Sequence, residues 1–274
     1  MLSSNAPIAD WSNRTVWLIG ASDGIGLALG QMLRAKGARL VVSARRAQAL
    51  EEHFPDPSVL KLPLDVNDSG AVGRALDQLQ AQSHLPDVVV WMVGQYEPAG
   101  LLDLSPHTAK AVLQTNLLSA YDALAAVLPV WRHQMADSGQ APQDSGQRWP
   151  RPHWVFVSSV AGYRGLPRAA DYGASKAGLS HLAQVAHIEL KPVGIDVSLV
   201  CPGFVSTRLT AKNSFRMPAV ITPEQAANSI LKGLAKGQFE IHFPKRLSLL
   251  LKLLGLLPIG LYLRLIQAIN PNQS

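Results

Sequence analysis

Short apolar segments alternate with longer amphipathic segments along most of this sequence. The short segments are rich in β-branched and other apolar residues, and they predict strands at 15–19, 40–43, 59–62, 87–93, 154–158, 195–200 and 239–242. Between them, apolar residues at helical spacing predict helices near 24–36, 68–81, 108–135, 171–190 and 223–236. Strands that are apolar throughout are typical of a sheet covered on both faces. The alternation therefore predicts an α/β fold: one doubly wound parallel sheet of about seven strands, with right-handed crossovers and helices on both faces.

The length and apolar content are compatible with one folded domain. The chain has 274 residues, of which 47% are hydrophobic and 16% charged, so it can bury a large core. The strand–helix pattern ends near residue 244. We therefore expect a single domain at 1–244 and an apolar, basic helical extension at 245–274. Residues 137–152 are rich in Gln, Ser, Gly and Pro and predict a surface loop.

Cysteine and charge content exclude several classes of protein. The one cysteine, Cys201, rules out an intrachain disulfide and a multi-cysteine metal site, and no metal site is predicted. We expect a reducing, cytoplasmic location, and no secretory signal pattern opens the chain. Of the net charge of +6, four charges come from residues 241–274, which contain no acidic residue. Since this basic segment is also rich in leucine, it indicates a membrane surface rather than a nucleic acid as a partner.

A glycine-rich turn follows the first predicted strand and opens the first predicted helix. It consists of Gly20, Ala21, Ser22, Asp23, Gly24, Ile25 and Gly26. Glycines at this spacing allow a tight turn and let a pyrophosphate approach the backbone amides at the helix start, where the helix dipole favours negative charge. Strand, turn and helix together predict a Rossmann-like dinucleotide site.

The end of the second predicted strand indicates which dinucleotide binds. In dinucleotide-binding folds, an acidic residue at this point holds the ribose 2′-hydroxyl of NAD. Here Ala44 takes that position, and Arg45 and Arg46 follow it. Because a guanidinium can hold a 2′-phosphate through two hydrogen bonds, we expect NADP(H) to be favoured over NAD(H). The alternative is that both arginines belong to a solvated basic turn.

Tyr172 and Lys176 are four residues apart at the start of a predicted helix, so their side chains share one helical face. A lysine ammonium beside a phenol lowers the pKa of the phenol from about 10 toward neutral pH. Such a phenol can donate a proton to a developing alkoxide or accept one in the opposite direction. Two serines, Ser158 and Ser159, end the preceding strand, and Ser159 precedes Tyr172 by 13 residues.

From about residue 14 to 242 the sequence resembles the short-chain dehydrogenase/reductase family. The glycine turn, an acidic residue after the third strand, a helix asparagine, a serine, Tyr-x-x-x-Lys and a Pro-Gly segment occur in the order that the family shows. The resemblance implies a catalytic set of Asn116, Ser159, Tyr172 and Lys176. Ser159 would orient the substrate oxygen, with Ser158 as the competing serine, and Asn116 would kink its helix and hold a water that feeds protons to Lys176. Family members are commonly dimers or tetramers, so a homo-oligomer is expected.

The resemblance also implies where the cofactor binds. Asp65 corresponds to the acidic residue that meets the adenine amino group, and the segment from Pro202 to Thr207 corresponds to the one that holds the nicotinamide carboxamide. The expected contacts are Gly20, Ser22, Asp23, Gly24, Ile25, Gly26, Arg45, Arg46, Asp65, Val66, Gly94, Tyr172, Lys176, Pro202, Gly203, Val205 and Thr207. Cys201 has no evident partner base and is interpreted as a small buried residue.

Two positions depart from the family pattern. Ile19 stands where family members usually carry threonine, and the segment that usually reads Asn-Asn-Ala-Gly begins with Trp91 and Met92 before Val93 and Gly94. The polar residues normally brace the first strand against the fourth. Since both partners are replaced together, we interpret the change as an exchange of hydrogen bonds for apolar packing, which can be nearly neutral for stability.

Residues 247–269 are mostly Leu and Ile and are long enough for a membrane span, but Lys252, Arg264 and a Gly/Pro-containing centre interrupt them. Two short amphipathic helices joined at 257–260 fit better. This tail can form a lid over the substrate pocket, lie in a bilayer interface or bury a dimer contact. The segment around 206–220 usually covers the substrate in the family, and apolar residues are frequent here: Phe204, Phe215, Met217 and Val220.

These features together predict an NADPH-dependent enzyme that reduces the carbonyl of a small hydrophobic, lipid-like substrate to an alcohol. One alternative is an NAD-dependent alcohol dehydrogenase of the same family, which differs mainly at positions 44–46. The other is a nucleotide-binding scaffold without catalysis, which we would expect to lack Tyr172, Lys176 or Ser159. All three residues are present.

Overall fold

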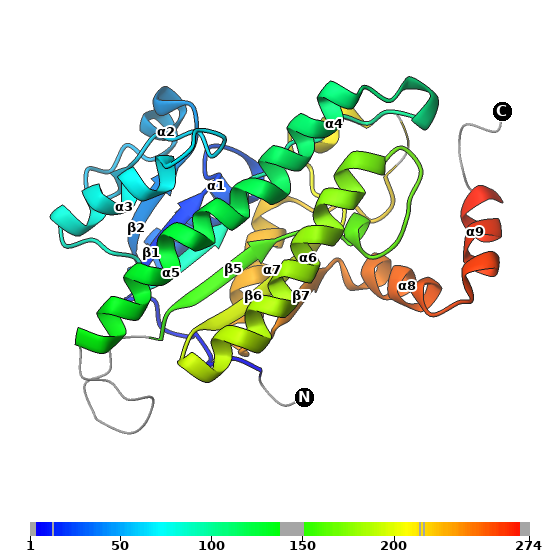
Figure 1. The fold of residues 1–274 in the computed structure, drawn as a ribbon. Helices are drawn as coiled ribbons and strands as arrows, with labels where there is room; N and C mark the ends of the chain where they lie inside the picture. Colours follow the sequence, from blue (N-terminus) through cyan, green and yellow to red (C-terminus); the bar gives the residue numbers. More distant parts are fainter. Residues whose placement is uncertain (1–3, 13, 138–150, 214, 216, 269–274) are drawn as a thin grey trace.

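A seven-stranded parallel sheet forms the centre of the molecule in the computed structural model, which describes residues 4–12, 14–137, 151–213, 215 and 217–268 (Figure 1). The strands are β1 (Thr15–Ile19), β2 (Arg39–Ser43), β3 (Leu60–Lys61), β4 (Val88–Trp91), β5 (His153–Val157), β6 (Asp196–Pro202) and β7 (Glu240–Phe243). Their order is β3-β2-β1-β4-β5-β6-β7, with every neighbouring pair parallel. The predicted doubly wound sheet is confirmed. Its strand order reverses between β1 and β4, which opens a crevice at the carboxyl ends of these strands.

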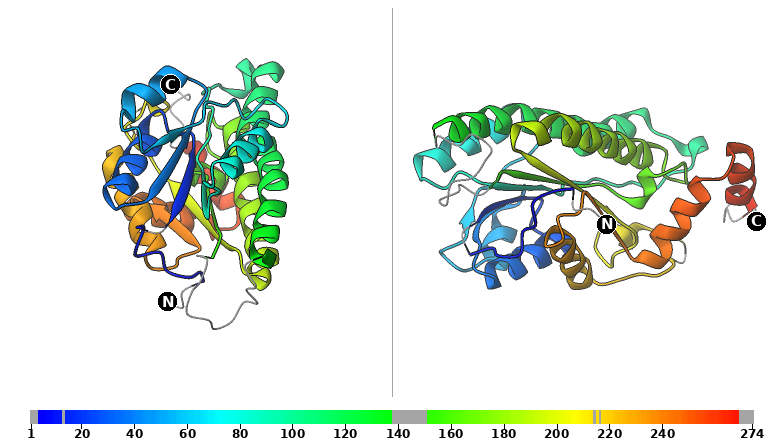
Figure 2. Two further views of the ribbon diagram at one scale, coloured as in Figure 1. Left: turned by 90° about the vertical axis from the view of Figure 1, so that its left-hand side faces the viewer. Right: turned by 90° about the horizontal axis from the view of Figure 1, so that it is seen from below.

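Helices cover both faces of the sheet (Figure 2). They are α1 (Gly24–Ala35), α2 (Ala47–His53), α3 (Ala71–Ala81), α4 (Pro106–Leu113), α5 (Ser119–Asp137), α6 (Ala170–Leu190) and α7 (Pro223–Leu234). Apolar residues of α1, α2 and α7 pack on one face, and those of α3, α5 and α6 pack on the other. The sequence pattern did not predict α2, because its seven residues bury only Ala49 and Leu50, too few for a recognisable helical period.

Successive residues of the central strands enter different cores, as the two-residue period of a strand requires. In β1, Val16 and Leu18 contact the α1/α7 side, whereas Trp17 and Ile19 contact the α3/α5/α6 side. The second core contains four fully buried tryptophans: Trp17, Trp91, Trp131 and Trp154. Trp91 and Trp154 stack with ring centroids 6.4 Å apart, which fixes β4 against β5.

The helix predicted at 108–135 is interrupted in the structure. A π-helical turn, Gln114–Leu118, lies between α4 and α5. Within the described residues, the run Pro106–Ala136 is the one helix long and apolar enough to cross a membrane by length and composition, and 44% of its most apolar window is buried. Its buried residues, including Ala120, Val127 and Trp131, belong to the core, which accounts for the apolar character without a membrane.

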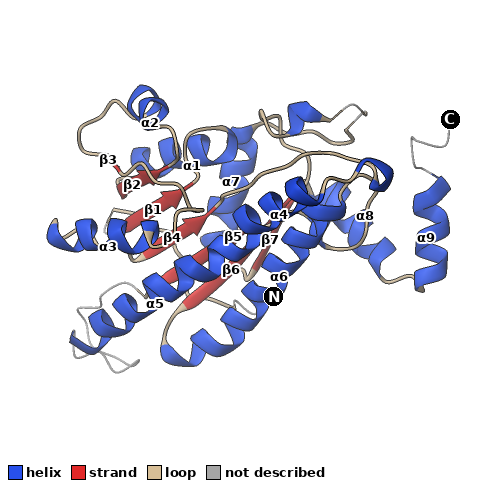
Figure 3. Ribbon diagram, turned by 45° about the horizontal axis from the view of Figure 1, so that its top comes forward, coloured by secondary structure: helices blue, strands red, loops and turns tan. Residues whose placement is uncertain are grey.

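After β7 the chain forms two further helices, α8 (Lys245–Gly255) and α9 (Ile259–Ala268), as the tail pattern predicts. Figure 3 shows that they project from the sheet layers beyond the end of α6. The last residue of the predicted tail, 269, and most of the predicted loop at 137–152 lie outside the described residues. A short 3-10 turn, η1 (Leu101–Asp103), precedes α4.

Candidate functional site

The residues predicted to act in chemistry meet at the carboxyl edge of the sheet. Ser159 follows β5, Tyr172 and Lys176 lie in the first two turns of α6, and Asn116 lies in the π-helical turn. The side chains of Asn116 and Lys176 are almost fully buried, and that of Ser159 is 9% exposed. Four positions from separate parts of the chain therefore come together at this edge of the sheet.

Hydrogen bonds distinguish the two serines at the end of β5. Ser158 Oγ donates to the carbonyl of Lys176 at 2.8 Å and pairs with Ser180 Oγ at 2.8 Å, so this side chain is occupied inside the protein. Ser159 Oγ accepts from the Ala161 amide at 3.1 Å and is hydrogen-bonded to the Tyr172 side chain. Ser159 is therefore the serine next to the phenol.

The pKa of Tyr172 differs from the sequence-based prediction. Burial raises the pKa of Tyr172 to about 12, against the opposing effect of the hydrogen bond to Ser159. Burial lowers the pKa of Lys176 to about 8. The prediction that Lys176 lowers the pKa of the phenol is therefore wrong for this arrangement. Lys176 Nζ donates to the carbonyls of Val157 at 3.0 Å and Val93 at 3.4 Å, and it lies 5.8 Å from the centroid of the Tyr172 ring.

Asn116 uses the π-helical turn to reach the loop after β4. Its Oδ1 accepts from the Gln95 amide at 2.6 Å, and its Nδ2 donates to the Gln95 carbonyl at 2.9 Å and to Ser175 Oγ at 3.0 Å. The extra residue of a π turn widens the helix and frees local backbone positions. Asn116 thus clamps both backbone groups of Gln95, a residue that the sequence analysis missed, and links this loop to α6.

The glycine turn has the geometry that a dinucleotide needs. Gly20 and Gly24 have φ angles of +104° and +52°, which favour glycine, and a Cβ on Gly26 would lie 2.3 Å from the carbonyl oxygen of Gly20. Asp23 caps α1 by accepting from the Gly24 amide at 2.7 Å, and its carboxylate lies 3.4 Å from Arg208 Nε. A depression of about 380 Å³ runs from this turn along α1 toward the start of α7, and its lining includes Asp23, Gly24, Gln31, Thr207 and Glu224. Backbone amides at a helix start beside an open depression fit a pyrophosphate.

The predicted adenosine-side residues lie at the ends of β2 and β3. Arg45 and Arg46 are exposed just before α2, and neither has an ion-pair partner within the described ranges. Asp65 is exposed and accepts from the Asn67 amide at 3.0 Å, and the neighbouring Val66 is buried. Exposed guanidinium groups at this strand end are placed where a dinucleotide-binding fold holds the adenosine ribose.

The segment after β6 closes the other side of the crevice. The carbonyl of Pro202 accepts from Ser159 Oγ at 3.5 Å, and Val205 pairs with Ile221. Thr207 lies so close to the glycine turn that a Cβ on Gly24 would be 2.7 Å from its methyl group. A Cβ on Gly94 would be 3.7 Å from Lys176 Nζ, and one on Gly203 would be 2.9 Å from Leu247 of α8. Two of the predicted cofactor segments, the glycine turn and the segment after β6, are therefore in contact at Gly24 and Thr207.

Comparison with protein families matches residues 14–217 to the short chain dehydrogenase model. The chain belongs to this family. It is an NAD(P)-dependent oxidoreductase.

Named relatives and a solved structure agree with this assignment. An uncharacterized oxidoreductase of Myxococcus xanthus is 33% identical over 260 residues, covering 93% of this chain and 97% of the relative. The 3-oxoacyl-[acyl-carrier-protein] reductase MabA of Mycobacterium tuberculosis is 29% identical over 198 residues, covering 72% of each chain. The structure of a short chain dehydrogenase from Burkholderia cenocepacia in complex with NADP superposes with a TM-score of 0.79 at 21% identity, covering 96% of this chain and 100% of the other.

The two departures of this short-chain dehydrogenase from the family pattern lie side by side in the sheet. Ile19 and Trp91 are register partners in β1 and β4, and both are fully buried. Met92 follows, and its sulfur would lie 2.8 Å from a Cβ on Gly26, so its side chain packs beneath the glycine turn. The interpretation as apolar compensation is consistent with this packing, and the crevice is not filled by Trp91.

Tyr96 is a second residue of the site that sequence reasoning missed. Its ring meets the Tyr172 ring edge-on, with centroids 4.8 Å apart, and its hydroxyl donates to Asn213 Oδ1 at 2.7 Å. Lys212 Nζ donates to the Tyr96 carbonyl at 3.1 Å. These two hydrogen bonds join the loop after β4 to the segment after β6 next to Tyr172. The one sequence signal for Tyr96 was its position two residues after Gly94, a predicted cofactor contact.

Cys201 is a free cysteine that lies buried in the core. Burial raises the pKa of the Cys201 thiol to about 12, so it stays protonated at neutral pH and is a poor nucleophile. In the part of the chain that the structure describes, no group of three or more His, Cys, Asp and Glu side chains is placed to hold a metal ion.

Proposed function

We propose that this short-chain dehydrogenase uses NADPH to reduce a ketone of a small hydrophobic, lipid-like substrate to an alcohol. The observation that carries the proposal is the Tyr172 hydroxyl, hydrogen-bonded to Ser159 at the carboxyl edge of the sheet, the same edge at which the glycine turn follows β1. The resemblance to a relative named as a 3-oxoacyl reductase, and to a structure solved with NADP, supports a carbonyl substrate and a phosphorylated cofactor.

Each catalytic residue has a proposed task. NADPH, when bound, supplies a hydride to the carbonyl carbon. With a pKa of about 12, the Tyr172 phenol is protonated at neutral pH and can donate its proton to the oxygen as negative charge develops there. Ser159 holds the same oxygen, and Lys176, whose ammonium group is held by the carbonyls of Val93 and Val157, binds the nicotinamide ribose. Asn116 positions the Gln95 loop and supports return of the proton to the site.

The cofactor contacts remain those expected from the sequence. We propose that Gly20, Ser22, Asp23, Gly24, Ile25 and Gly26 hold the pyrophosphate side, that Asp65 and Val66 meet the adenine, and that Gly94, Pro202, Gly203, Val205 and Thr207 hold the nicotinamide side. Arg45 and Arg46 are proposed to bind the 2′-phosphate, which favours NADP(H) over NAD(H). Their exposed, unpaired guanidinium groups support this choice.

Replacing Arg45 and Arg46 together by Gln is expected to weaken NADPH binding and leave NADH binding unchanged. A hydrogen bond to a charged group contributes about 2 kcal/mol, so the dissociation constant for NADPH should rise by roughly 30-fold or more. Quenching of tryptophan fluorescence during titration measures both constants. A double variant of two exposed lysines, Lys36→Gln with Lys232→Gln, removes the same charge elsewhere and should bind as the natural protein does. Equal losses for NADH and NADPH would contradict a role in phosphate recognition.

The apolar side chains of the segment after β6 support a hydrophobic substrate. Phe204 and Phe215 meet edge-on with centroids 5.8 Å apart, and the Met217 sulfur accepts from Asn213 Nδ2 at 3.2 Å. Val220, at the end of the same segment, is 43% exposed. This segment is joined to Tyr96 through Asn213, and its apolar side chains would select for shape and hydrophobicity rather than for a charged substrate.

A series of 2-alkanones of increasing chain length tests the proposed function. NADPH oxidation should be observed, and kcat/KM should rise by roughly fourfold per added methylene, since each buried methylene contributes about 0.8 kcal/mol. The increase should stop when the pocket is filled. A kcat/KM that does not change along the series would contradict the hydrophobic substrate. Oxidation of alcohols with NAD⁺, without any ketone reduction, would favour the alternative dehydrogenase.

Finer points of organisation are proposals as well. We propose that residues 1–244 form the catalytic domain and that 245–274 are an extension of it. Members of the family typically process small molecules as oligomers, and we propose a dimer or tetramer. A single cysteine that is buried as a protonated thiol is compatible with the proposed cytoplasmic location.

A further inference from the structure

The two tail helices are fastened to the loop that carries the catalytic serine and tyrosine at its ends. Arg164 Nη1 donates to the carbonyls of Gly255 and Leu257, both at 2.9 Å, and so caps the end of α8. The same guanidinium lies 4.6 Å from the centroid of the Tyr262 ring, and the Tyr262 hydroxyl donates to the Gly165 carbonyl at 2.7 Å. Residues 164 and 165 lie between Ser159 and Tyr172. The tail therefore has a fixed position next to the active-site loop.

A second set of contacts fixes α8 to the sheet edge. Lys252 Nζ lies 2.5 Å from Glu240 Oε2, and the Tyr163 hydroxyl donates to Glu240 Oε1 at 2.7 Å. Ser248, fully buried, pairs with His242 Nδ1 at 2.7 Å. The polar residues that interrupt the leucines of α8 thus face the protein. This arrangement is the reverse of an ordinary surface helix, whose polar side faces solvent.

The leucines consequently point outward. Leu249, Leu250, Leu253 and Leu256 of the α8 end are 49%, 53%, 64% and 82% exposed. In α9 only Tyr262 and Ile266 are buried, whereas the other large apolar side chains are 43–57% exposed: Ile259, Leu261, Leu263 and Leu265. We call these eight exposed side chains the apolar tail surface. So many exposed large apolar side chains on two successive helices are unusual on a monomer and indicate a binding partner.

The same end of the molecule carries one more exposed apolar segment. Leu101 and Leu102 of η1 are 74% and 103% exposed. Figure 1 and the right-hand view of Figure 2 both place this segment, between β4 and α4, at the end from which α8 and α9 project. The active-site crevice opens at this end, because the carboxyl ends of the strands point there.

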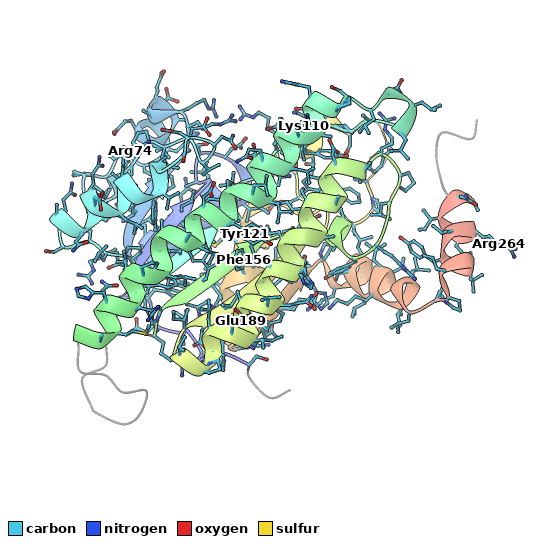
Figure 4. The ribbon with its side chains drawn as sticks, in the orientation of Figure 1. Arg74, Lys110, Tyr121, Phe156, Glu189 and Arg264 are labelled. Carbon is cyan, nitrogen blue, oxygen red and sulfur yellow. The ribbon has the colours of Figure 1, made fainter. Side chains whose placement is uncertain are left out.

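Charge decides which partner fits the apolar tail surface. Lys245, Arg246 and Arg264 are exposed beside the leucines, and residues 241–274 contain no acidic side chain. Figure 4 shows Arg264 on the side of α9 that faces away from the body. In a symmetric contact between two copies, these cations would approach one another without a carboxylate from the tail to pair with. Anionic lipid headgroups would pair with all of them.

We propose that the apolar tail surface docks on an anionic phospholipid bilayer. The helices would lie in the interface with leucines among the acyl chains and cations at the headgroups. They would not cross it: α9 has ten residues, which extend roughly 15 Å, whereas the hydrocarbon core is about 30 Å thick. Docking in this orientation brings the loop between Ser159 and Tyr172 to the membrane surface, where a lipid-like ketone of the kind proposed above is dissolved.

Cosedimentation of the full-length protein with vesicles tests the docking. The protein should bind vesicles of phosphatidylcholine mixed with phosphatidylglycerol, and bind less to phosphatidylcholine alone. Leu253→Gln with Leu261→Gln should lower the partition coefficient at least tenfold. Arg246→Gln with Arg264→Gln should lower it roughly 25-fold on the mixed vesicles, because each cation near an anionic leaflet contributes about fivefold.

Matched controls use equally exposed positions in other parts of the structure. Ile188→Gln removes an apolar side chain that is 70% exposed near the end of α6, and Lys36→Gln removes a cation that follows α1. Both variants should bind vesicles as the natural protein does. Turnover of a water-soluble ketone by the Leu253/Leu261 variant should be unchanged, so a failure of docking and a failure of the proposed chemistry give different results.

Two results would overturn the proposal. In the first, natural protein and the Leu253/Leu261 variant partition equally. In the second, the natural protein remains in the supernatant with every vesicle, and sedimentation velocity shows an assembly that the leucine substitutions dissociate. The second result would assign the surface to another copy of the chain instead.

Discussion

Tyr172→Phe is expected to lower kcat for ketone reduction by about a thousandfold and to leave NADPH affinity within about threefold of the natural value. The substitution removes only the hydroxyl that is hydrogen-bonded to Ser159. Phenylalanine keeps the ring that packs edge-on against Tyr96 at 4.8 Å, so the crevice keeps its shape. Without the phenol, no group with a proton to donate lies at the same position beside Ser159. The loss should therefore appear in the chemical step.

Steady-state NADPH oxidation and fluorescence titration measure the two quantities separately. Tyr121→Phe is the matched control, since Tyr121 lies on α5 with its side chain 49% exposed (Figure 4). It should change neither kcat nor affinity. Near-natural turnover by the Tyr172→Phe enzyme would exclude the proposed proton donor. A loss of cofactor affinity as large as the loss of kcat would instead indicate that the substitution disturbs the fold of the crevice.

The sequence was sufficient to predict those parts of the structure that depend on local pattern. The apolar runs of β1 and β6 and the glycine turn are short-range features, and the structure has them at the predicted positions. The tail forms two helices as its Gly/Pro centre predicts. In each case the residues that determine the conformation are neighbours in the chain. The π-helical turn at Asn116 is different, because the residue pattern predicted an unbroken helix over 108–135 and only the family resemblance implied a kink there.

What could not be predicted depends on contacts between distant segments. The pairing of Tyr96 with Asn213 joins residues 117 positions apart, and Arg164 caps α8 across more than 90 positions. The raised pKa of Tyr172 likewise follows from burial among segments that are distant in the sequence, and Lys176 does not offset it. The sequence places the lysine one helical turn from the phenol, but the carbonyls of Val93 and Val157 hold its ammonium group. Helical spacing predicts proximity and does not predict which acceptor is used.

The presence of Ile19 and Trp91, where family members usually carry polar residues, illustrates the same limit. Two apolar replacements in register could be predicted to pack together, and they do. The stacking of Trp91 on Trp154, and the edge-on contact of Trp154 with Trp131, required knowledge of β5 and α5 as well. A core of large aromatic side chains thus replaces hydrogen bonds that family members usually have between β1 and β4.

Gly26→Ala is expected to lower the free energy of unfolding by about 3 kcal/mol and to weaken NADPH binding strongly. Its Cβ would lie 2.3 Å from the Gly20 carbonyl oxygen and 2.8 Å from the Met92 sulfur. The sulfur is on a flexible side chain and can move, but the carbonyl belongs to the glycine turn. Relief of the overlap must therefore displace the backbone that faces the pyrophosphate site. Urea denaturation and fluorescence titration measure the two effects.

Gly73→Ala provides the comparison within the same protein. Gly73 lies inside α3, and a Cβ there would have no atom within 4 Å. Alanine is the better helix former, so this variant should gain about 0.5–1 kcal/mol of stability and bind NADPH normally. The same chemical change should thus destabilise the protein at one glycine and stabilise it at the other. If both variants unfold at the same urea concentration, the tight packing of Gly26 against Gly20 and Met92 does not hold in solution. The apolar support that Met92 gives to the cofactor turn would then have to be rejected as well.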